Sequence, residues 1–180
     1  MKLRLIDPES LIPDAHTAAE AAVRGVEVLI IDHLREKNNS TQPNRYGLPK
    51  TNYYAEAAKS VAASVDGATV RVEVGSDSTE KDAPGIGIAL HYYGGTVYPN
   101  NGKKALALPI DPAVAGIWPS EYSRDHKLFK SPGGALGDAD TGQILWVLLP
   151  KATIKADPTV LPTDEKILSE AEEAVWEAFS

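Results

Sequence analysis

The sequence predicts an α+β fold in which N-terminal helices pack on a mainly antiparallel sheet, and three observations support this prediction. Apolar residues recur at helical spacing near both ends of the chain, in residues 14–38 and 163–180. Between these ends, residues 68–75 and 105–110 alternate with the period of two that is typical of strands. The order helix, helix, strands, helix is typical of an α+β domain.

The length of 180 residues suits one domain of ordinary size. We expect a single α+β domain over residues 1–162, with a loop or hairpin excursion at 113–142. A proline tether then leads to a C-terminal helix over residues 163–180.

Residues 14–38 predict the first helix. Asp14 and Thr17 are competing N-caps, because Thr17-Ala-Ala-Glu20 has capping-box spacing whereas Asp14 stands one turn earlier. The apolar side of this helix is formed by Ala15, Ala18, Ala19, Ala22, Val26, Leu29, Ile30, His33 and Leu34. The Asn38-Asn39-Ser40 cluster predicts its end.

Residues 51–65 predict a second helix, which Thr51 or Asn52 can cap. Gly67 is expected to end this helix, since glycine takes the left-handed conformation at a C-cap easily. The segment ATVRVEVG, residues 68–75, then predicts a half-buried strand.

The middle of the chain contains two further strand patterns. ALALPI at 105–110 stops at Asp111-Pro112, and QILWVLLP at 143–150 has an extended continuation in KATIKADP. Between them, residues 113–142 hold many turn formers and no clear period, which predicts a partly ordered excursion or an inserted hairpin.

The C-terminal helix is the most acidic part of the sequence. The formal charge of the chain is −7, and residues 164–180 contribute −5 of it, with six acids against Lys166. Thr163 or Asp164 can cap the helix, whose acidic first turn suits the positive end of the helix dipole. We therefore expect this helix to be a docking element beside a nearly neutral domain.

Motifs for catalysis and metal binding are weak. The absence of cysteine excludes a disulfide framework, a Cys-based zinc site, an iron–sulfur cluster and thiol catalysis. The histidines show neither an HExxH motif nor i,i+4 pairing, and no serine lies in a nucleophile elbow. His91 and His126 could form an acid–base or metal site with Asp111 only through the fold, so this stays a minor alternative, and we expect no cofactor.

Partner classes are also limited by the sequence. No run of about 18 apolar residues is present, and the start MKLRLIDPES does not resemble a signal peptide, so no membrane contact is expected. The sequence shows no basic face of the kind that specific nucleic-acid binding requires. The pair Gly94-Gly95 lacks the spacing of a phosphate-binding loop and predicts a structural turn between two apolar segments.

Aromatic residues in the 113–142 segment allow two interpretations. Trp118, Tyr122 and Phe129 lie where little regular structure is predicted. They form either a small local core or anchors for another chain. In both cases the sequence favours an assembly or binding module over an enzyme.

Four ordered segments of residues 86–180 resemble the virion-morphogenesis or tail-completion proteins of tailed bacteriophages. The first is HYYGGTVYPNNGKKALALPI, whose matching residues are His91, Tyr93, Gly94, Gly95, Thr96, Pro99, Lys103, Lys104, Ala105, Leu106, Ala107, Leu108, Pro109 and Ile110. The others are DPAVAGIWPSEY, HKLFKSPGGALGD and ILWVLLPKATIKADPTVLP. The chain departs from the family pattern in its short link TQPNRYGLPKTNYYAEAA and in ADPTVLP, where a proline-rich aromatic motif is usual.

The resemblance implies a non-enzymatic structural protein of phage or prophage virion assembly, made in the bacterial cytoplasm and located in the virion. It would act at the tail or head–tail junction, contacting other virion proteins and copies of itself in a ring. The expected contact elements are the 113–142 segment and the C-terminal helix, with candidate contact residues Trp118, Tyr122, Phe129, Glu170, Glu173 and Glu177. The alternatives are a phage-encoded hydrolase that uses His91 or His126 with nearby acids, and an assembly adaptor or chaperone that leaves the particle.

Overall fold

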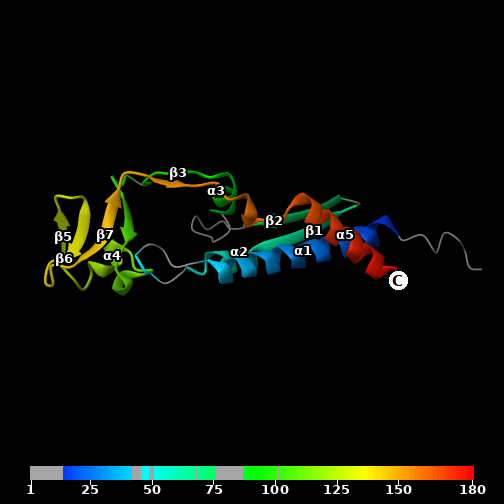
Figure 1. Ribbon diagram of the computed structural model, residues 1–180, viewed down its shortest axis with the longest axis horizontal. Coiled ribbons are helices and arrows are strands. Elements are labelled where there is room, and N and C mark those ends of the chain that lie inside the picture. The colour runs from blue at the N-terminus through cyan, green and yellow to red at the C-terminus, as the bar shows by residue number, and fades with distance from the viewer. Residues whose placement is uncertain (1–13, 42–45, 49–50, 68, 76–86, 101) are drawn as a thin grey trace, which may run out of the picture. The chain divides into compact units, whose positions relative to one another are not determined.

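The computed structural model describes residues 14–41, 46–48, 51–67, 69–75, 87–100 and 102–180 (Figure 1). The chain has an α+β fold, as the sequence predicts, with helices near both ends and antiparallel strands between them. Its contacts divide it into two compact units. Unit 1 comprises Met1–Asn39, Asn52–Tyr92 and Pro158–Ser180, and unit 2 comprises Ser40–Thr51 and Tyr93–Asp157.

Unit 1 combines helices with one two-stranded sheet. Its elements are α1 (Ala15–Ser40), α2 (Tyr53–Lys59), β1 (Val61–Asp66), β2 (Thr69–Val74), α3 (Ile88–Tyr93), the 3-10 turn η4 (Pro158–Val160) and α5 (Asp164–Ala178). The long first helix is confirmed, and Asp14 is its cap. The Asp14 side chain accepts a hydrogen bond from the His16 amide at 3.3 Å, and its carbonyl accepts one from Ala18 at 3.0 Å.

The predicted second helix is wrong in its second half. Helix α2 ends at Lys59, and Val61–Asp66 forms strand β1, which pairs antiparallel with β2 from Val61↔Val74 to Asp66↔Thr69. Valines at 61 and 65 fit a pleated strand well, and pairing with the valines of β2 outweighs the helical tendency of the alanines. Gly67, with a φ of 59°, lies in the tight turn of this hairpin and not at a helix C-cap.

The core of unit 1 joins segments that are far apart in the sequence. One stripe of α1 packs against α2, α3 and η4, and the buried cluster contains Val26, Ile30, Leu34, Ala57, Ala58, Ile88 and Val160. Ile167 and Ala171 of α5 pack on the same cluster.

The expected proline tether before α5 is therefore part of the core. Val160 is fully buried, and His33 Nε2 donates to the Thr159 carbonyl at 3.0 Å while Lys37 Nζ donates to Thr159 Oγ1 at 2.6 Å. Thr163 caps α5, as the sequence predicts, by accepting from the Lys166 amide.

Unit 2 is built from antiparallel strands. Its elements are β3 (Gly95–Val97), β4 (Leu106–Pro109), the 3-10 turn η3 (Pro112–Val114), α4 (Pro119–Tyr122), β5 (Leu128–Ser131), β6 (Ala135–Asp138), β7 (Ile144–Leu149) and β8 (Ala152–Ile154). Strands β4, β7, β6 and β5 form one sheet in that order, and β3 pairs with β8 in a separate ribbon. The small core beside the four-stranded sheet contains Val114, Leu145 and Trp146.

The predicted excursion at 113–142 consists largely of regular structure. Of the two interpretations open for it, the structure shows a hairpin, β5–β6, which extends the sheet through pairing of β6 with β7. Gly137 lies at the register shift in β6, where a Cβ would stand 2.5 Å from Phe129 Cε1 and 2.6 Å from the Gln143 carbonyl oxygen. Glycine at 137 therefore permits both the bulge and the close packing of Phe129.

The turn predicted at Gly94-Gly95 lies between α3 and β3. Gly94 has a φ of 71°, and a Cβ there would lie 2.6 Å from the Ala156 amide nitrogen and 3.0 Å from the Ile154 carbonyl oxygen. Gly95 is the first residue of β3 and pairs with Ile154. The backbone of residues 154–156 thus runs so close to Gly94 that a side chain would not fit.

Candidate interaction surfaces and the Asp138 network

The outer side of helix α5 exposes large apolar side chains. Leu168 and Trp176 are 63% and 76% exposed, and Phe179, just after the helix, is 39% exposed. Leu168, Glu172, Trp176 and Phe179 follow one another at steps of four, four and three residues, so they share one side of the helix. We call these four residues the outer face of α5. Single exposed apolar residues are common on proteins, whereas a grouped set is typical of an interaction site.

A shallow groove lies between α5 and α1, whose ribbons cross in Figure 1. Gly25 permits the close approach of the helices, since a Cβ there would lie 2.7 Å from Ala174 Cβ. The groove contains the three acidic residues expected to make partner contacts and one arginine, and its full lining is Ala21, Arg24, Gly25, Val28, Glu170, Glu173, Ala174, Glu177 and Ala178.

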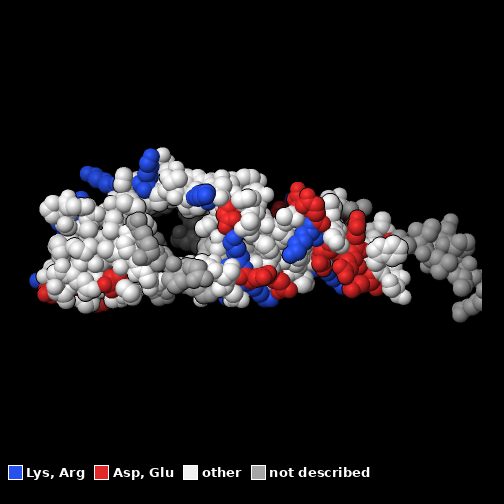
Figure 2. All heavy atoms as spheres, viewed as in Figure 1, with Lys and Arg blue, Asp and Glu red and all other residues white. Residues whose placement is uncertain are grey.

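The acidity predicted for the C-terminal helix extends to the whole of unit 1. The segments of unit 1 contain nine Lys and Arg residues and 19 Asp and Glu residues, whereas those of unit 2 contain nine and six. Their formal charges are therefore −10 and +3. On the face drawn in Figure 2, acidic side chains gather over α1 and α5, and few are visible over unit 2.

The β3–β8 ribbon presents a basic face. Alternation along the two strands, continued to the residues that flank them, places one set of side chains on the same side, and all members of this set are exposed: Thr96, Tyr98, Lys151, Thr153 and Lys155. We call this set the ribbon face. The exposed Lys103 and Lys104 follow β3 in the chain. The ribbon face thus combines lysines with a tyrosine that is 64% exposed.

The aromatic residues of the 113–142 segment have different surroundings. Trp118, which precedes α4, is 65% exposed. Tyr122 is half-buried, with its ring edge-on to Trp146 at 5.4 Å between centroids and stacked on His126 at 4.2 Å. Phe129 is half-buried against Gly137. Of the three, Trp118 alone has a mostly exposed side chain.

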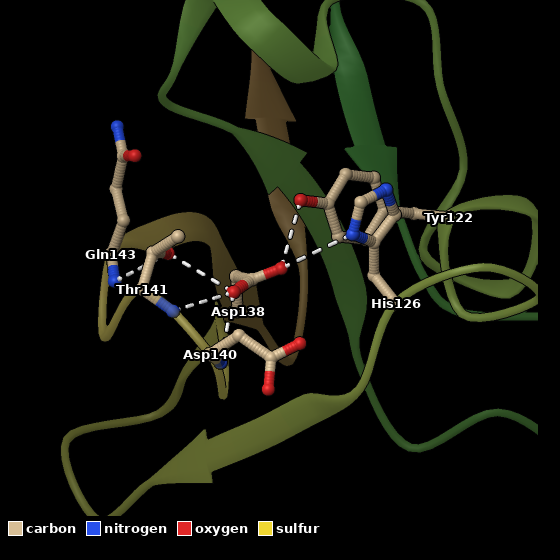
Figure 3. A network of polar contacts seen from close by, with 6 residues as sticks. All are labelled: Tyr122, His126, Asp138, Asp140, Thr141 and Gln143. Atoms are coloured by element: carbon tan, nitrogen blue, oxygen red, sulfur yellow. Dashed lines mark hydrogen bonds and ion pairs between the residues drawn. The ribbon is translucent and has the colours of Figure 1, made fainter.

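A buried carboxylate, Asp138, organises the turn between β6 and β7 (Figure 3). Its side chain is 4% exposed. Oδ1 accepts hydrogen bonds from the amides of Asp140 and Thr141 at 2.9 and 2.8 Å and from Thr141 Oγ1 at 3.0 Å. Oδ2 accepts one from the Tyr122 hydroxyl at 3.0 Å and lies 3.6 Å from His126 Nδ1.

These contacts shift the pKa values of Asp138 and Tyr122. Hydrogen bonds, first that from the Thr141 amide, lower the pKa of Asp138 below its ordinary value. Burial and the bond to Asp138 raise the pKa of Tyr122. A carboxylate that already accepts four hydrogen bonds has little capacity left to act as a base. We therefore interpret the network as a structural clamp on the β6–β7 turn.

Asp138 is not among the site residues predicted above, although the sequence around it carries a signal. In Asp138-Ala-Asp-Thr-Gly142, an aspartate begins a segment of turn residues, which is the pattern of an Asx turn.

The two histidines of the enzyme alternative lie in different units. His126 belongs to the Asp138 network. His91 is in α3, where its ring stacks on Tyr53 at 4.8 Å, and its Nδ1 lies 3.3 Å from the Tyr54 hydroxyl. Asp111 caps η3 by accepting from the Ala113 amide and also accepts from Gln143 Nε2. The structure thus gives each of these groups separate neighbours.

The described ranges contain neither a metal-binding cluster nor a membrane-spanning helix. Within them, no group of three or more His, Cys, Asp or Glu side chains is arranged to hold a metal ion. Likewise, none of the helices that the structure describes is long and apolar enough to cross a membrane.

Comparisons with protein-family models, curated proteins and solved structures find no match for this chain. The resemblance to tail-completion proteins therefore depends on the four sequence segments given above, and the function that it implies is a proposal.

Proposed function

We propose that this protein is a non-enzymatic structural component of phage or prophage virions, acting at the tail or head–tail junction through protein–protein contacts. The observation that carries the proposal is the outer face of α5, where Leu168, Trp176 and Phe179 are exposed together. Aromatic residues of this kind dominate the energetics of protein interfaces. The ordered sequence resemblance supports the virion as the place of that interface.

The composition of particles tests the proposal. Virions purified from the parent phage or from an induced prophage are analysed by mass spectrometry, and we expect peptides of this chain at stoichiometric abundance with the tail proteins. Complete particles without the chain would contradict the structural role. Loss of particle completion in a gene deletion, with the chain absent from finished particles, would favour the adaptor or chaperone alternative.

A substitution on α5 then links the surface to the function. Leu168→Ala with Trp176→Ala removes two exposed side chains and should leave the fold intact, because neither belongs to the core cluster of unit 1. We expect the variant to fold but fail to complement a deletion strain. Full complementation would show that the outer face of α5 is not the virion contact.

The enzyme alternative has its own test. His91→Ala with His126→Ala should leave particle yield unchanged, apart from losses traced to stability in a thermal melt. A folded double variant that makes no particles would favour catalysis.

A further inference from the structure

We propose that copies of this chain associate head to tail, with the outer face of α5 in one copy bound to the ribbon face of a second copy. The inference deepens the proposed function and rests on it only for the expectation that copies assemble. The occupant of the α5 face is thus a second copy of this chain.

The α5 side offers apolar anchors beside negative charge. At 3.6 residues per turn, Leu168, Glu172, Trp176 and Phe179 fall within a sector of about 80°. Glu172 and the neighbouring Glu173 are exposed, and a different side of the helix packs on the core through Ile167 and Ala171.

The ribbon face offers positive charge and an aromatic side chain, which complement the α5 face. Lys151 and Lys155 are exposed immediately before and after β8, and Tyr98, which follows β3, supplies an aromatic contact. The alkyl stems of lysines cover apolar surface while their charges reach carboxylates. A lysine can also bind over the face of Trp176 through a cation–π contact.

The charge distribution favours a second copy as the partner. Formal charges of −10 and +3 on the two units mean that each copy carries both members of a complementary pair. Two different surfaces that meet in this way make a heterologous interface, which closes into a ring or continues as a filament. The closed ring is the form that the proposed function expects.

The competing occupant of the ribbon face is a nucleic acid, since a two-stranded β-ribbon fits the major groove of DNA. The total charge of −7 opposes that interaction at long range. Binding to DNA is therefore an outcome of the test and not our proposal.

Charge exchange gives the sharpest test. Lys151→Glu with Lys155→Glu reverses the ribbon face, and Glu172→Lys with Glu173→Lys reverses the α5 face. Sedimentation velocity should show self-association of the natural chain at about 0.05 M salt, weakened roughly tenfold at about 0.5 M. Each reversed variant should be monomeric, and a mixture of the two should associate again. The control Lys127→Glu with Lys130→Glu has the same charge change elsewhere in unit 2 and should associate normally.

Cysteine pairing tests the geometry directly, because the chain has no cysteine of its own. A mixture of Thr153→Cys and Glu172→Cys variants should form a mixed disulfide dimer under mild oxidation. Exposed control positions, Ser64→Cys and Ser123→Cys, should cross-link at only a background rate.

Several outcomes would overturn the inference. The natural chain could remain monomeric up to its solubility limit, the mixed reversed variants could fail to associate, or the cysteine pair could behave like its controls. The natural chain could also bind a short DNA duplex at about 0.15 M salt. If Lys151→Glu with Lys155→Glu abolished this binding and left self-association unchanged, the ribbon face would be assigned to nucleic acid. Association in solution by a chain absent from particles would instead contradict only the proposed function.

Discussion

In unit 1 the buried contacts are mainly apolar and join α1, α2, α3 and η4, whose positions in the sequence are widely separated. In unit 2 the strands of the larger sheet lie mostly beside their sequence neighbours, and its apolar core is smaller. The buried Asp138 fixes the turn between two of these strands. The stability of unit 2 therefore depends on specific polar and steric contacts, whereas the stability of unit 1 depends mainly on the packing of helices.

The largest effect is expected from Asp138→Asn. The amide keeps the shape of the side chain, but its NH₂ group cannot accept the hydrogen bond that Tyr122 donates to Oδ2. The Tyr122 hydroxyl must then accept from that NH₂ group instead of donating, and the three bonds to Oδ1 lose the negative charge that strengthens them. Unit 2 should therefore lose more stability than through any glycine substitution below. Hydrogen exchange read by mass spectrometry should show faster exchange in β6 and β7, with α1 unchanged.

The matched control for this change is Asp140→Asn, which removes the same charge from an exposed side chain two residues away. If both substitutions destabilised unit 2 equally, the loss of negative charge, and not the loss of the hydrogen-bond network, would explain the effect. Faster exchange in both units would contradict the separation of their stabilities.

Acid should also affect the two units differently. The pKa of Asp138 is lowered in the folded chain, so its contribution is fully present above the unfolded pKa of about 4. That contribution disappears as the pH falls through the lower folded value. Unit 2 of the natural chain should therefore lose protection below about pH 4 more steeply than unit 2 of Asp138→Asn. Parallel pH profiles for the two proteins would contradict this assignment.

A steric test of unit 2 is Gly137→Ala. The new Cβ would meet Phe129 Cε1 at 2.5 Å and the Gln143 carbonyl oxygen at 2.6 Å. We expect a loss of about 2 kcal/mol in the free energy of unfolding, because overpacking shifts the backbone. Gly133→Ala is the control, since its nearest contact is Ser131 Oγ at 3.8 Å. Urea unfolding followed by tryptophan fluorescence in a Trp176→Phe background reports on unit 2 through Trp118 and Trp146.

Unit 1 has a corresponding test in Gly25→Ala, with a smaller effect. Alanine favours a helix by about 1 kcal/mol over glycine, but this Cβ would lie 2.7 Å from Ala174 Cβ and 3.3 Å from the Glu170 carbonyl oxygen. We expect a net loss of about 1 kcal/mol in the stability of unit 1, measured by hydrogen exchange in α5. Ala174→Gly alone should also cost about 1 kcal/mol, because it places glycine inside α5. The double variant should lose less stability than the sum of the two single losses, and a simple sum would contradict the contact between positions 25 and 174.

The fold was predictable where one period dominates the sequence. The stripe of α1 and the cap of α5 at Thr163 follow from local patterns, whereas TNYYAEAAKSVAASV fits a helix and a helix followed by a strand equally well. Pairing with β2 decides between these two structures, and pairing is not visible in a single segment.

The candidate surfaces were predictable only in part. The acidic residues of α5 stand together in the sequence, but the ribbon face combines residues about 55 positions apart through strand pairing. The Asp138 network likewise includes Tyr122 and His126, which only the fold brings beside the β6–β7 turn. The turn residues themselves could be recognised in the sequence.

The smallest expected effect distinguishes two neighbouring tyrosines of unit 1. Among the residues that the structure describes, the Tyr53 hydroxyl is buried without a hydrogen-bond partner, and burial raises its pKa to about 12. The Tyr54 hydroxyl lies within bonding distance of His91 Nδ1. Tyr53→Phe should therefore leave stability at neutral pH within about 0.5 kcal/mol of the natural value, whereas Tyr54→Phe should lose about 1 kcal/mol.

High pH should separate the stabilities of the natural chain and Tyr53→Phe. Between pH 10 and 12 the unfolded tyrosine releases its proton while folded Tyr53 retains it, so rising pH destabilises the natural chain. Phenylalanine has no proton to release, and the variant should be the more stable protein in this range. Thermal melts of both proteins, compared at each pH, cancel the ionisation of the other tyrosines and lysines. A constant difference between the two across this range would contradict the burial of the Tyr53 hydroxyl in the folded chain.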